Sequence, residues 1–210
     1  MKKKLFYLGI LKNDTKPAFE LSREDDLSDW GVFSRPTVRE FAILFATEAA
    51  ETAKPNVMEW DKLAKHIDGL IYSYNLTKEG ICAIAITDLD YPKDAASALL
   101  NRVCKDFINK HPISAYKDLQ PPLKKSAPPL VLPELKEYIV KFQDPDEADP
   151  LIKIQREVEE TKRVLQRTIE SSLERDEKLD NLVAKSNVLS AQSKVFYTQA
   201  KKQNSCCVVM

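Results

Sequence analysis

The chain has 210 residues, a length that suits one domain of ordinary size with an extension, or two small domains. Lysine and arginine together number 32, and so do aspartate and glutamate, so the chain lacks the positive field of a general nucleic-acid binder. Hydrophobic residues make up 43% of the chain, which excludes disorder throughout. No glycine follows Gly80 and no proline follows Pro150, so the C-terminal part lacks both helix breakers. The sequence therefore predicts two halves that are built differently.

The N-terminal half begins with strand patterns. Residues 5–11 are apolar enough for a strand, and residues 18–21 can return beside them across a short polar turn. Two further strands are predicted at residues 70–74 and 81–86, with Gly80 in the turn between them. The last of these is apolar at nearly every position, which predicts a central strand covered on both faces.

Helices are predicted between and after these strands. One helix is expected to begin at Thr37, because Thr37 and Glu40 have the spacing of a capping box. An apolar face predicts a second helix over residues 93–109. The proline-rich residues 112–133 are interpreted as a surface loop in preference to a polyproline ligand, and a short helix follows at residues 134–142. The N-terminal half is therefore expected to be α+β, a mainly antiparallel sheet with helices packed against it.

The C-terminal half has a heptad pattern. Steps of three and four residues select one face of a long helix from Leu151 onward, which predicts a left-handed coiled coil. The apolar core positions of this face are Leu151, Ile154, Val158, Leu165, Leu179, Leu182, Leu189 and Phe196. Threonine and serine occupy other core positions, so self-association should be weak. The segment is therefore interpreted as one strand of a hetero-assembly whose partners supply the missing hydrophobic surface.

Arg175 falls on the same helix face, between Leu165 and Leu179. In a sealed bundle its guanidinium needs acceptors from partner helices, and such a polar layer would fix the register. In a more open two-helix seam, the side chain would instead extend to solvent. The heptad pattern by itself leaves these two alternatives open.

The last four residues, Cys207-Val208-Val209-Met210, have the form of a prenylation signal, and the terminal methionine favours farnesyl. Cys206 would then lie at the membrane, where a second lipid makes a weak anchor durable. After Asp180 the chain has lysines and no acidic residue, which suits an anionic membrane surface. No stretch reaches the length of about 18 apolar residues that a transmembrane helix needs. A membrane anchor of this kind favours the buried alternative for Arg175.

Several short motifs resemble those of one protein family. The run Leu173-Glu174-Arg175-Asp176-Glu177-Lys178-Leu179 looks like the central-layer motif of the synaptobrevin-type R-SNAREs. Ile86-Thr87-Asp88-Leu89-Asp90-Tyr91-Pro92 resembles part of their longin domain. Phe142-Gln143-Asp144-Pro145, Ser193-Lys194-Val195-Phe196-Tyr197 and Asn204-Ser205-Cys206-Cys207 resemble the prenylated, Ykt-type branch of that family. The resemblance covers nearly the whole chain, and the proline-rich segment departs from it.

The resemblance implies an α+β architecture with two parts and a linker. Residues 1–135 would form a longin domain, a profilin-like fold with a five-stranded antiparallel sheet between helices. Residues 136–149 would be a linker with a short helix, and residues 150–210 a long SNARE coiled-coil helix that ends in the lipidation signal. The family also implies a closed form in which the longin domain folds back over the SNARE helix and shelters the lipid. Phe41, Leu44 and Phe45 are the candidates for that surface, with packing in the core as the alternative for two of the three.

The resemblance also implies a role in membrane fusion. Arg175 would face glutamines from three Q-SNARE helices in a parallel four-helix bundle, whose zippering from Leu151 onward drives vesicle docking and fusion. A prenyltransferase would farnesylate Cys207, which would carry a methyl ester after removal of Val208, Val209 and Met210, and Cys206 would be palmitoylated. An ATPase with its adaptor would disassemble the bundle. The protein would cycle between the cytosol and the cytoplasmic face of Golgi, ER, endosomal, vacuolar and vesicle membranes.

No enzyme activity is expected. The chain has no phosphate-binding loop, no zinc-protease motif and no nucleophile elbow, so catalytic residues, metals and cofactors other than the covalent lipids are not predicted. Nucleic acid is not an expected partner. The alternative function is a prenylated coiled-coil adaptor that recruits a complex to membranes without fusing them. A lone basic residue among apolar layers favours the SNARE interpretation, because an adaptor does not need one.

Overall fold

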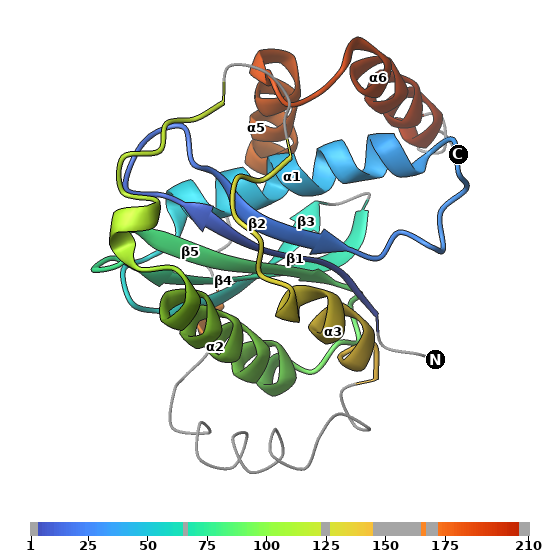
Figure 1. Ribbon diagram of the computed structural model, residues 1–210. Coiled ribbons are helices and arrows are strands. Elements are labelled where there is room, and N and C mark those ends of the chain that lie inside the picture. Colours follow the sequence, from blue (N-terminus) through green and yellow to red (C-terminus); the bar gives the residue numbers. More distant parts are fainter. Residues whose placement is uncertain (1–3, 65–66, 123–126, 145–164, 167–171, 206–210) are drawn as a thin grey trace.

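A computed structural model describes residues 4–64, 67–122, 127–144, 165–166 and 172–205 (Figure 1). Its centre is a twisted sheet with the strand order β2-β1-β5-β4-β3-β6. The strands are β1 (Leu5–Lys12), β2 (Phe19–Asp25), β3 (Met58–Ala64), β4 (Ile67–Leu76), β5 (Ile81–Thr87) and the short β6 (Leu165–Gln166). The first five pair antiparallel, and β6 pairs parallel with β3. The expected α+β class with a five-stranded antiparallel sheet is confirmed.

Helices cover both faces of the sheet. They are α1 (Arg35–Thr52), α2 (Lys93–Lys110), α3 (Glu134–Lys141), α5 (Ser172–Lys185) and α6 (Ala191–Ser205), with a 3-10 turn η1 (Ile113–Ala115). Figure 1 shows α2 and α3 against one face and α1 against the other, with α5 and α6 on the outer side of α1. The second half of the chain thus returns to the face opposite α3.

The central strand β5 explains why two hydrophobic clusters form. Its side chains alternate between the faces, as the strand geometry requires, and all of its residues are buried. Ile81, Ala83 and Ala85 belong to the cluster under α2 and α3. Cys82, Ile84 and Ile86 belong to the cluster under α1, where the helix contributes Ala42, Ala46, Ala49 and Ala50. The buried sheet-facing residues of α1 are mostly alanine, with Ile43 and Phe45 packed beside them, whereas Phe41 and Leu44 belong to a separate cluster.

The predicted capping box at the start of α1 is wrong. The helix begins at Arg35, two residues earlier than expected, and Ser34 makes no side-chain capping bond. Pro36 fits in the first turn because the amides there have no partner within the helix. Thr37 is therefore inside the helix, and its side chain is buried.

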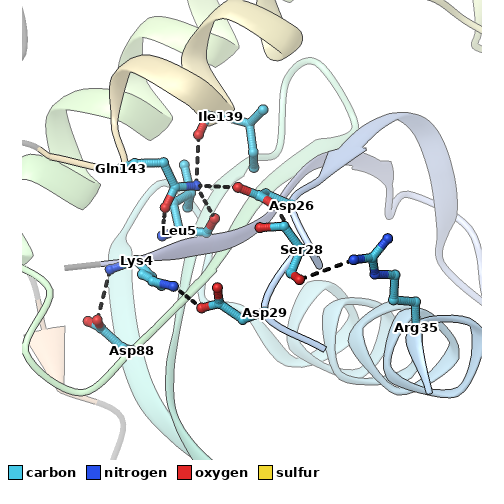
Figure 2. Close-up of polar contacts among 9 residues, drawn as sticks. All are labelled: Lys4, Leu5, Asp26, Ser28, Asp29, Arg35, Asp88, Ile139 and Gln143. Atoms are coloured by element: carbon cyan, nitrogen blue, oxygen red, sulfur yellow. Dashed lines mark hydrogen bonds and ion pairs between the residues drawn. The ribbon is translucent and has the colours of Figure 1, made fainter. Parts of the chain in front are cut away.

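The end of α3 is fastened to the first strand by Gln143 (Figure 2). The Gln143 side-chain amide donates to the carbonyls of Leu5 and Ile139 at 2.7 and 2.9 Å, and its oxygen accepts the Leu5 amide at 3.3 Å. Its Nε2 also lies 3.4 Å from Oδ2 of Asp26. Phe142 is buried in the core under α3. The short helix expected in the linker therefore packs as part of the folded body.

The proline-rich segment runs along the edge strand β2 where the structure describes it. The Leu130 amide donates to the carbonyl of Leu21 at 2.9 Å, and the Leu132 amide donates to Ser22 Oγ at 3.2 Å. Tyr116 and Leu132 are buried in the core. In residues 112–122 and 127–133, η1 is the one regular element, and a few buried residues anchor the segment. It covers part of a sheet edge that would otherwise expose unpaired backbone groups.

Candidate functional site

The outer face of α1 holds the C-terminal helices through a small apolar cluster. Leu44 of α1, Val183 of α5 and Leu189 between α5 and α6 are buried together, with exposed fractions of 6, 5 and 6%. Half-buried side chains border this cluster, namely Phe41, Leu179 and Tyr197. The rings of Phe41 and Tyr197 lie 6.1 Å apart between centroids. Two predicted heptad core residues, Leu179 and Leu189, are thus directed at α1 in this structure.

The three candidate residues for the surface on α1 divide between two environments. Phe41 and Leu44 pack against the C-terminal helices. Phe45 is partly buried and packs with the cluster between α1 and the sheet, which was the alternative interpretation. Its ring lies 6.3 Å from that of Phe41, so it also supports that side chain from behind.

A serine-capped turn interrupts the heptad segment between α5 and α6. Residues 186–190 separate α5 from α6, and Ser186 Oγ accepts the amides of Val188 and Leu189 at 3.1 and 3.2 Å. Ser190 precedes α6, and its Oγ accepts the Ser193 amide at 3.2 Å, the usual bond of an N-cap serine. The described segment is therefore two helices joined by a capped turn, in contrast to the continuous helix of the heptad pattern.

α1 binds this capped turn directly. The Glu40 carboxylate accepts the backbone amide of Ser190 at 2.7 Å. The Ser193 hydroxyl donates to Thr37 Oγ1 at 3.4 Å, and Ser193 is buried although it is a serine. The two residues that were expected to cap α1 itself thus contact the start of α6. A carboxylate here also meets the positive end of the α6 dipole.

Ion pairs fasten the two C-terminal helices to each other and to α1. Asp180 of α5 accepts the Tyr197 hydroxyl at 2.9 Å and pairs with Lys201 of α6. The Lys201 hydrogen bond is the main cause that lowers the pKa of the Asp180 carboxyl below its ordinary value. Lys178 pairs with Glu48 of α1 at 3.1 Å on the surface. Exposed pairs of this kind contribute little to stability, so the apolar cluster and the buried polar contacts carry the docking.

The position of α1 is fixed by a charged network at the end of β2. Arg39 donates two hydrogen bonds to the Asp25 carboxylate at 2.8 and 2.7 Å. Arg23 and the Tyr7 hydroxyl both donate to Glu20, each at 2.7 Å. Burial raises the pKa of the Glu20 carboxyl, while the Arg23 charge opposes that shift. The Arg39–Asp25 pair ties the N-terminal half of α1, which carries Thr37 and Glu40, to β2, and Arg23 joins Asp25 to Glu20 within the sheet.

A further part of the heptad segment lies at the sheet edge. Leu165 and Gln166 form β6 and pair with Glu59 and Trp60 of β3. Leu165 is a predicted core residue of the coiled coil, yet here its backbone is extended. The same residues cannot be an edge strand and a turn of a bundle helix at once.

The other predicted site residues are placed as follows. Leu182 is half-buried in α5, and Phe196 of α6 is 51% exposed. The backbone of Arg175 lies in α5, and nothing is described of its side chain. The remaining predicted residues lie outside the described ranges, namely Leu151, Ile154, Val158, Cys206, Cys207, Val208, Val209 and Met210.

The serine-capped turn between α5 and α6 was not predicted from the sequence. Ser186 and Ser190 stand four residues apart inside the heptad pattern, and serine is a preferred N-cap residue. A search for internal caps would have predicted an interruption of the helix at this point. Val183 was missed because it lies off the coiled-coil face.

Two general findings complete the description. Within the described part of the chain, no group of three or more His, Cys, Asp and Glu residues is arranged to hold a metal ion. Among the same residues, no helix combines the length and apolarity needed to span a membrane.

Comparison with known proteins shows the family. The Synaptobrevin family model matches residues 150–208, and a Regulated-SNARE-like domain model, Longin, matches residues 63–127. Synaptobrevin homolog YKT6 of Saccharomyces cerevisiae is 40% identical over 207 residues, which cover 99% of this chain and 100% of the yeast protein. The chain belongs to the YKT6 group of longin-type R-SNAREs.

Similar proteins are found in other organisms. Synaptobrevin homolog ykt6 of Schizosaccharomyces pombe is 38% identical over 98% of this chain and 99% of its own length. VAMP-like protein YKT61 of Arabidopsis thaliana is 40% identical over 90% of each chain. As a YKT6-type SNARE the protein functions in vesicle transport with other SNAREs, and it is not an enzyme.

Proposed function

We propose that this YKT6-type chain is an R-SNARE that exists in two mutually exclusive states, a folded-back state and a fusion-competent four-helix bundle. The observation that carries the proposal is the double use of the heptad face. Leu179, Leu189 and Ser193 contact or are buried against α1 in the folded chain, whereas the heptad pattern assigns them to the core of a bundle. One helix face cannot pack against α1 and against partner helices at the same time.

The folded-back state is the autoinhibited one. Binding to three Q-SNARE helices requires that α5 and α6 leave α1, that the turn at residues 186–190 becomes helical, and that β6 leaves the edge of β3. Each of these steps removes contacts made in the free chain, so the longin domain lowers the population that can start zippering. Phe41 and Leu44 are the apolar residues of α1 that oppose this release.

In the bundle, Arg175 is proposed to form the central polar layer with one glutamine from each Q-SNARE. The apolar layers around it are then Leu151, Ile154, Val158, Leu165, Leu179, Leu182, Leu189 and Phe196. Zippering from Leu151 toward the C-terminus would bring two membranes together and drive docking and fusion of vesicles. The ATPase and adaptor that act on SNARE bundles would then separate the four helices.

The membrane anchor is proposed to be lipid. Farnesyl and a methyl ester on Cys207, after removal of residues 208–210, would give reversible binding, and palmitoyl on Cys206 would make it durable. Control of the second lipid would let the protein cycle between the cytosol and the cytoplasmic face of Golgi, ER, endosomal and vacuolar membranes. A prenyltransferase is therefore a required partner.

The test is assembly with Q-SNAREs in a series of Arg175 variants. Arg175→Gln keeps donors for the neighbouring carbonyls, so its bundles should melt only slightly below those of the unmodified chain. Arg175→Leu leaves amides without a polar partner, at about 1–3 kcal/mol for each unsatisfied group. Arg175→Glu should melt lowest, because a buried carboxylate would lack a cation.

The competing function, a prenylated coiled-coil adaptor that does not fuse membranes, predicts a different result. An adaptor would form no stoichiometric complex with Q-SNAREs, and Arg175→Glu would not matter. A melting temperature for Arg175→Glu equal to that of the unmodified chain would place Arg175 in solvent and would contradict the bundle.

A further inference from the structure

The capped turn at residues 186–190 is incompatible with a continuous helix through this segment. In a continuous helix the Ser190 amide would donate to the carbonyl of Ser186, four residues earlier. Here that amide donates to Glu40 instead, at 2.7 Å. The Glu40–Ser190 hydrogen bond and a continuous helix through Ser190 therefore exclude each other.

The start of α6 lacks half of a capping box. In that motif the N-cap side chain accepts the N3 amide, and a Glu or Gln at N3 accepts the N-cap amide in return. Ser190 fulfils the first half by accepting the Ser193 amide. The N3 residue is itself Ser193, whose hydroxyl bonds Ser190 Oγ and Thr37 and cannot replace a Glu carboxylate. The missing acceptor is supplied by Glu40 from another helix.

We infer that Glu40 is the residue by which the longin domain distinguishes the interrupted SNARE helix from the continuous one. This inference rests on the proposed function, because it assumes that the folded-back state competes with the bundle. The apolar residues Phe41 and Leu44 would bind any apolar helix face that reaches them. Glu40 adds selectivity, since its carboxylate can accept the Ser190 amide only when that amide is released from the helix.

Thr37 extends the same recognition by one turn of α1. Thr37 and Glu40 are three residues apart and so lie on one face of the helix, next to Leu44 at the following turn. Thr37 contacts Ser193, and Glu40 contacts Ser190. The polar pair therefore contacts the first turn of α6, while Leu44 packs with Val183 of α5 and Leu189 of the turn, and Phe41 contacts Tyr197 farther along α6.

The experiment measures opening of the full chain by the distance between two labels. Lys105→Cys on α2 and Gln192→Cys on α6 are exposed positions on opposite sides of the sheet. Both replacements go into a chain with Cys206→Ser and Cys207→Ser, and the buried Cys82 and Cys104 are left in place. The labelled chain should show one distance that corresponds to the folded-back state.

Glu40→Ala should raise the ratio of open to closed chains about fivefold, the ordinary effect of losing a helix cap. Glu40→Gln retains an acceptor oxygen and should restore most of the closed population. The matched control is Glu48→Ala, which removes an acidic residue of the same helix whose partner, Lys178, is on the surface. It should change the ratio less than twofold.

Two further measurements distinguish a specific loss of the Glu40–Ser190 contact from a general loss of structure in Glu40→Ala. Hydrogen exchange at the Ser190 amide should accelerate in Glu40→Ala, while exchange in β5 stays unchanged. Bundles formed with Q-SNAREs should keep their melting temperature and form about fivefold faster, because Glu40 has no role in the bundle.

The possible failures can be told apart. An unmodified chain that already shows the open distance would overturn both the autoinhibited state and this inference. If Leu44→Ala opens the chain but Glu40→Ala leaves the distance and the Ser190 exchange rate unchanged, only the inference is overturned. An equal effect of Glu40→Ala and Glu48→Ala would also overturn it, since the effect would then be one of general charge.

Discussion

Replacement of Leu44 by alanine should release the C-terminal helices without unfolding the sheet. Leu44 is 6% exposed, and its neighbours in the cluster are Val183 and Leu189. Its contacts therefore belong to the docking surface, the face of α1 that packs against α5, α6 and the turn between them. Leucine-to-alanine changes in cores cost from about 2 to 5 kcal/mol, and this cluster is bordered by half-buried side chains that can close over the space. We therefore expect a loss of roughly 2–3 kcal/mol in docking, which corresponds to a roughly 30- to 150-fold shift toward the open state.

Hydrogen exchange of the full chain measures this directly. In Leu44→Ala, amides of α5 and α6 should exchange faster by the same factor, while those of β5 should be unaffected. The matched control is Ile43→Ala, because Ile43 is the adjacent residue of α1 and packs toward the sheet. Its effect should appear in β5. Loss of protection in β5 in the Leu44 variant, or unchanged exchange in α5 and α6, would refute this assignment of Leu44.

Three other predictions test separate parts of the account. Gln143→Ala should lower the free energy of unfolding by about 1–2 kcal/mol in urea titrations, because the carbonyls of Leu5 and Ile139 lose their donor. Gln143→Glu should lower it further. Equal stability of the two variants would contradict this role of Gln143. Burial raises the pKa of Glu20 above its ordinary 4.5, so the folded chain holds this proton more tightly than the unfolded chain does. Stability should therefore fall as the pH rises from 4.5 through the raised pKa, and Glu20→Gln should remove that part of the slope; an unchanged slope would show that Glu20 is not its source. Cys207→Ser should leave the protein in the soluble fraction after cell fractionation, whereas firm membrane binding of this variant would contradict the prenyl anchor.

Much of the longin part could be predicted because its local signals agree with the final packing. β1, β2, β4, β5 and α2 lie within a few residues of the predicted positions. The uniformly apolar β5 is the clearest case, since only a central strand buries every residue. By contrast, β3 carries Glu59, Asp61 and Lys62 among its apolar residues, and its pattern was not specific enough for a prediction. Its identity as a strand comes from pairing with β4.

The contacts of α1 with the C-terminal helices could not be predicted from local sequence patterns. The Thr37–Glu40 spacing fits a capping box, yet both side chains contact residues about 150 positions away, which no local pattern contains. The helix begins at Arg35, before the predicted start at Thr37, because Pro36 is compatible with the first turn of a helix. The heptad pattern predicts which face of the helix carries the apolar residues, but a pattern of core positions does not say which surface will cover them. In the free chain that surface is α1.

The most direct test of the two-state account is a disulfide between α1 and α6. Thr37 and Ser193 have hydroxyl oxygens 3.4 Å apart, so Thr37→Cys with Ser193→Cys can join the helices in the folded-back chain. The chain also carries Cys206→Ser and Cys207→Ser, and each single cysteine variant serves as a control. The account predicts that the oxidised double variant forms no bundle with Q-SNAREs and that reduction restores assembly to the level of the single variants. Bundle formation by the oxidised chain at the rate of the reduced one would contradict mutually exclusive states.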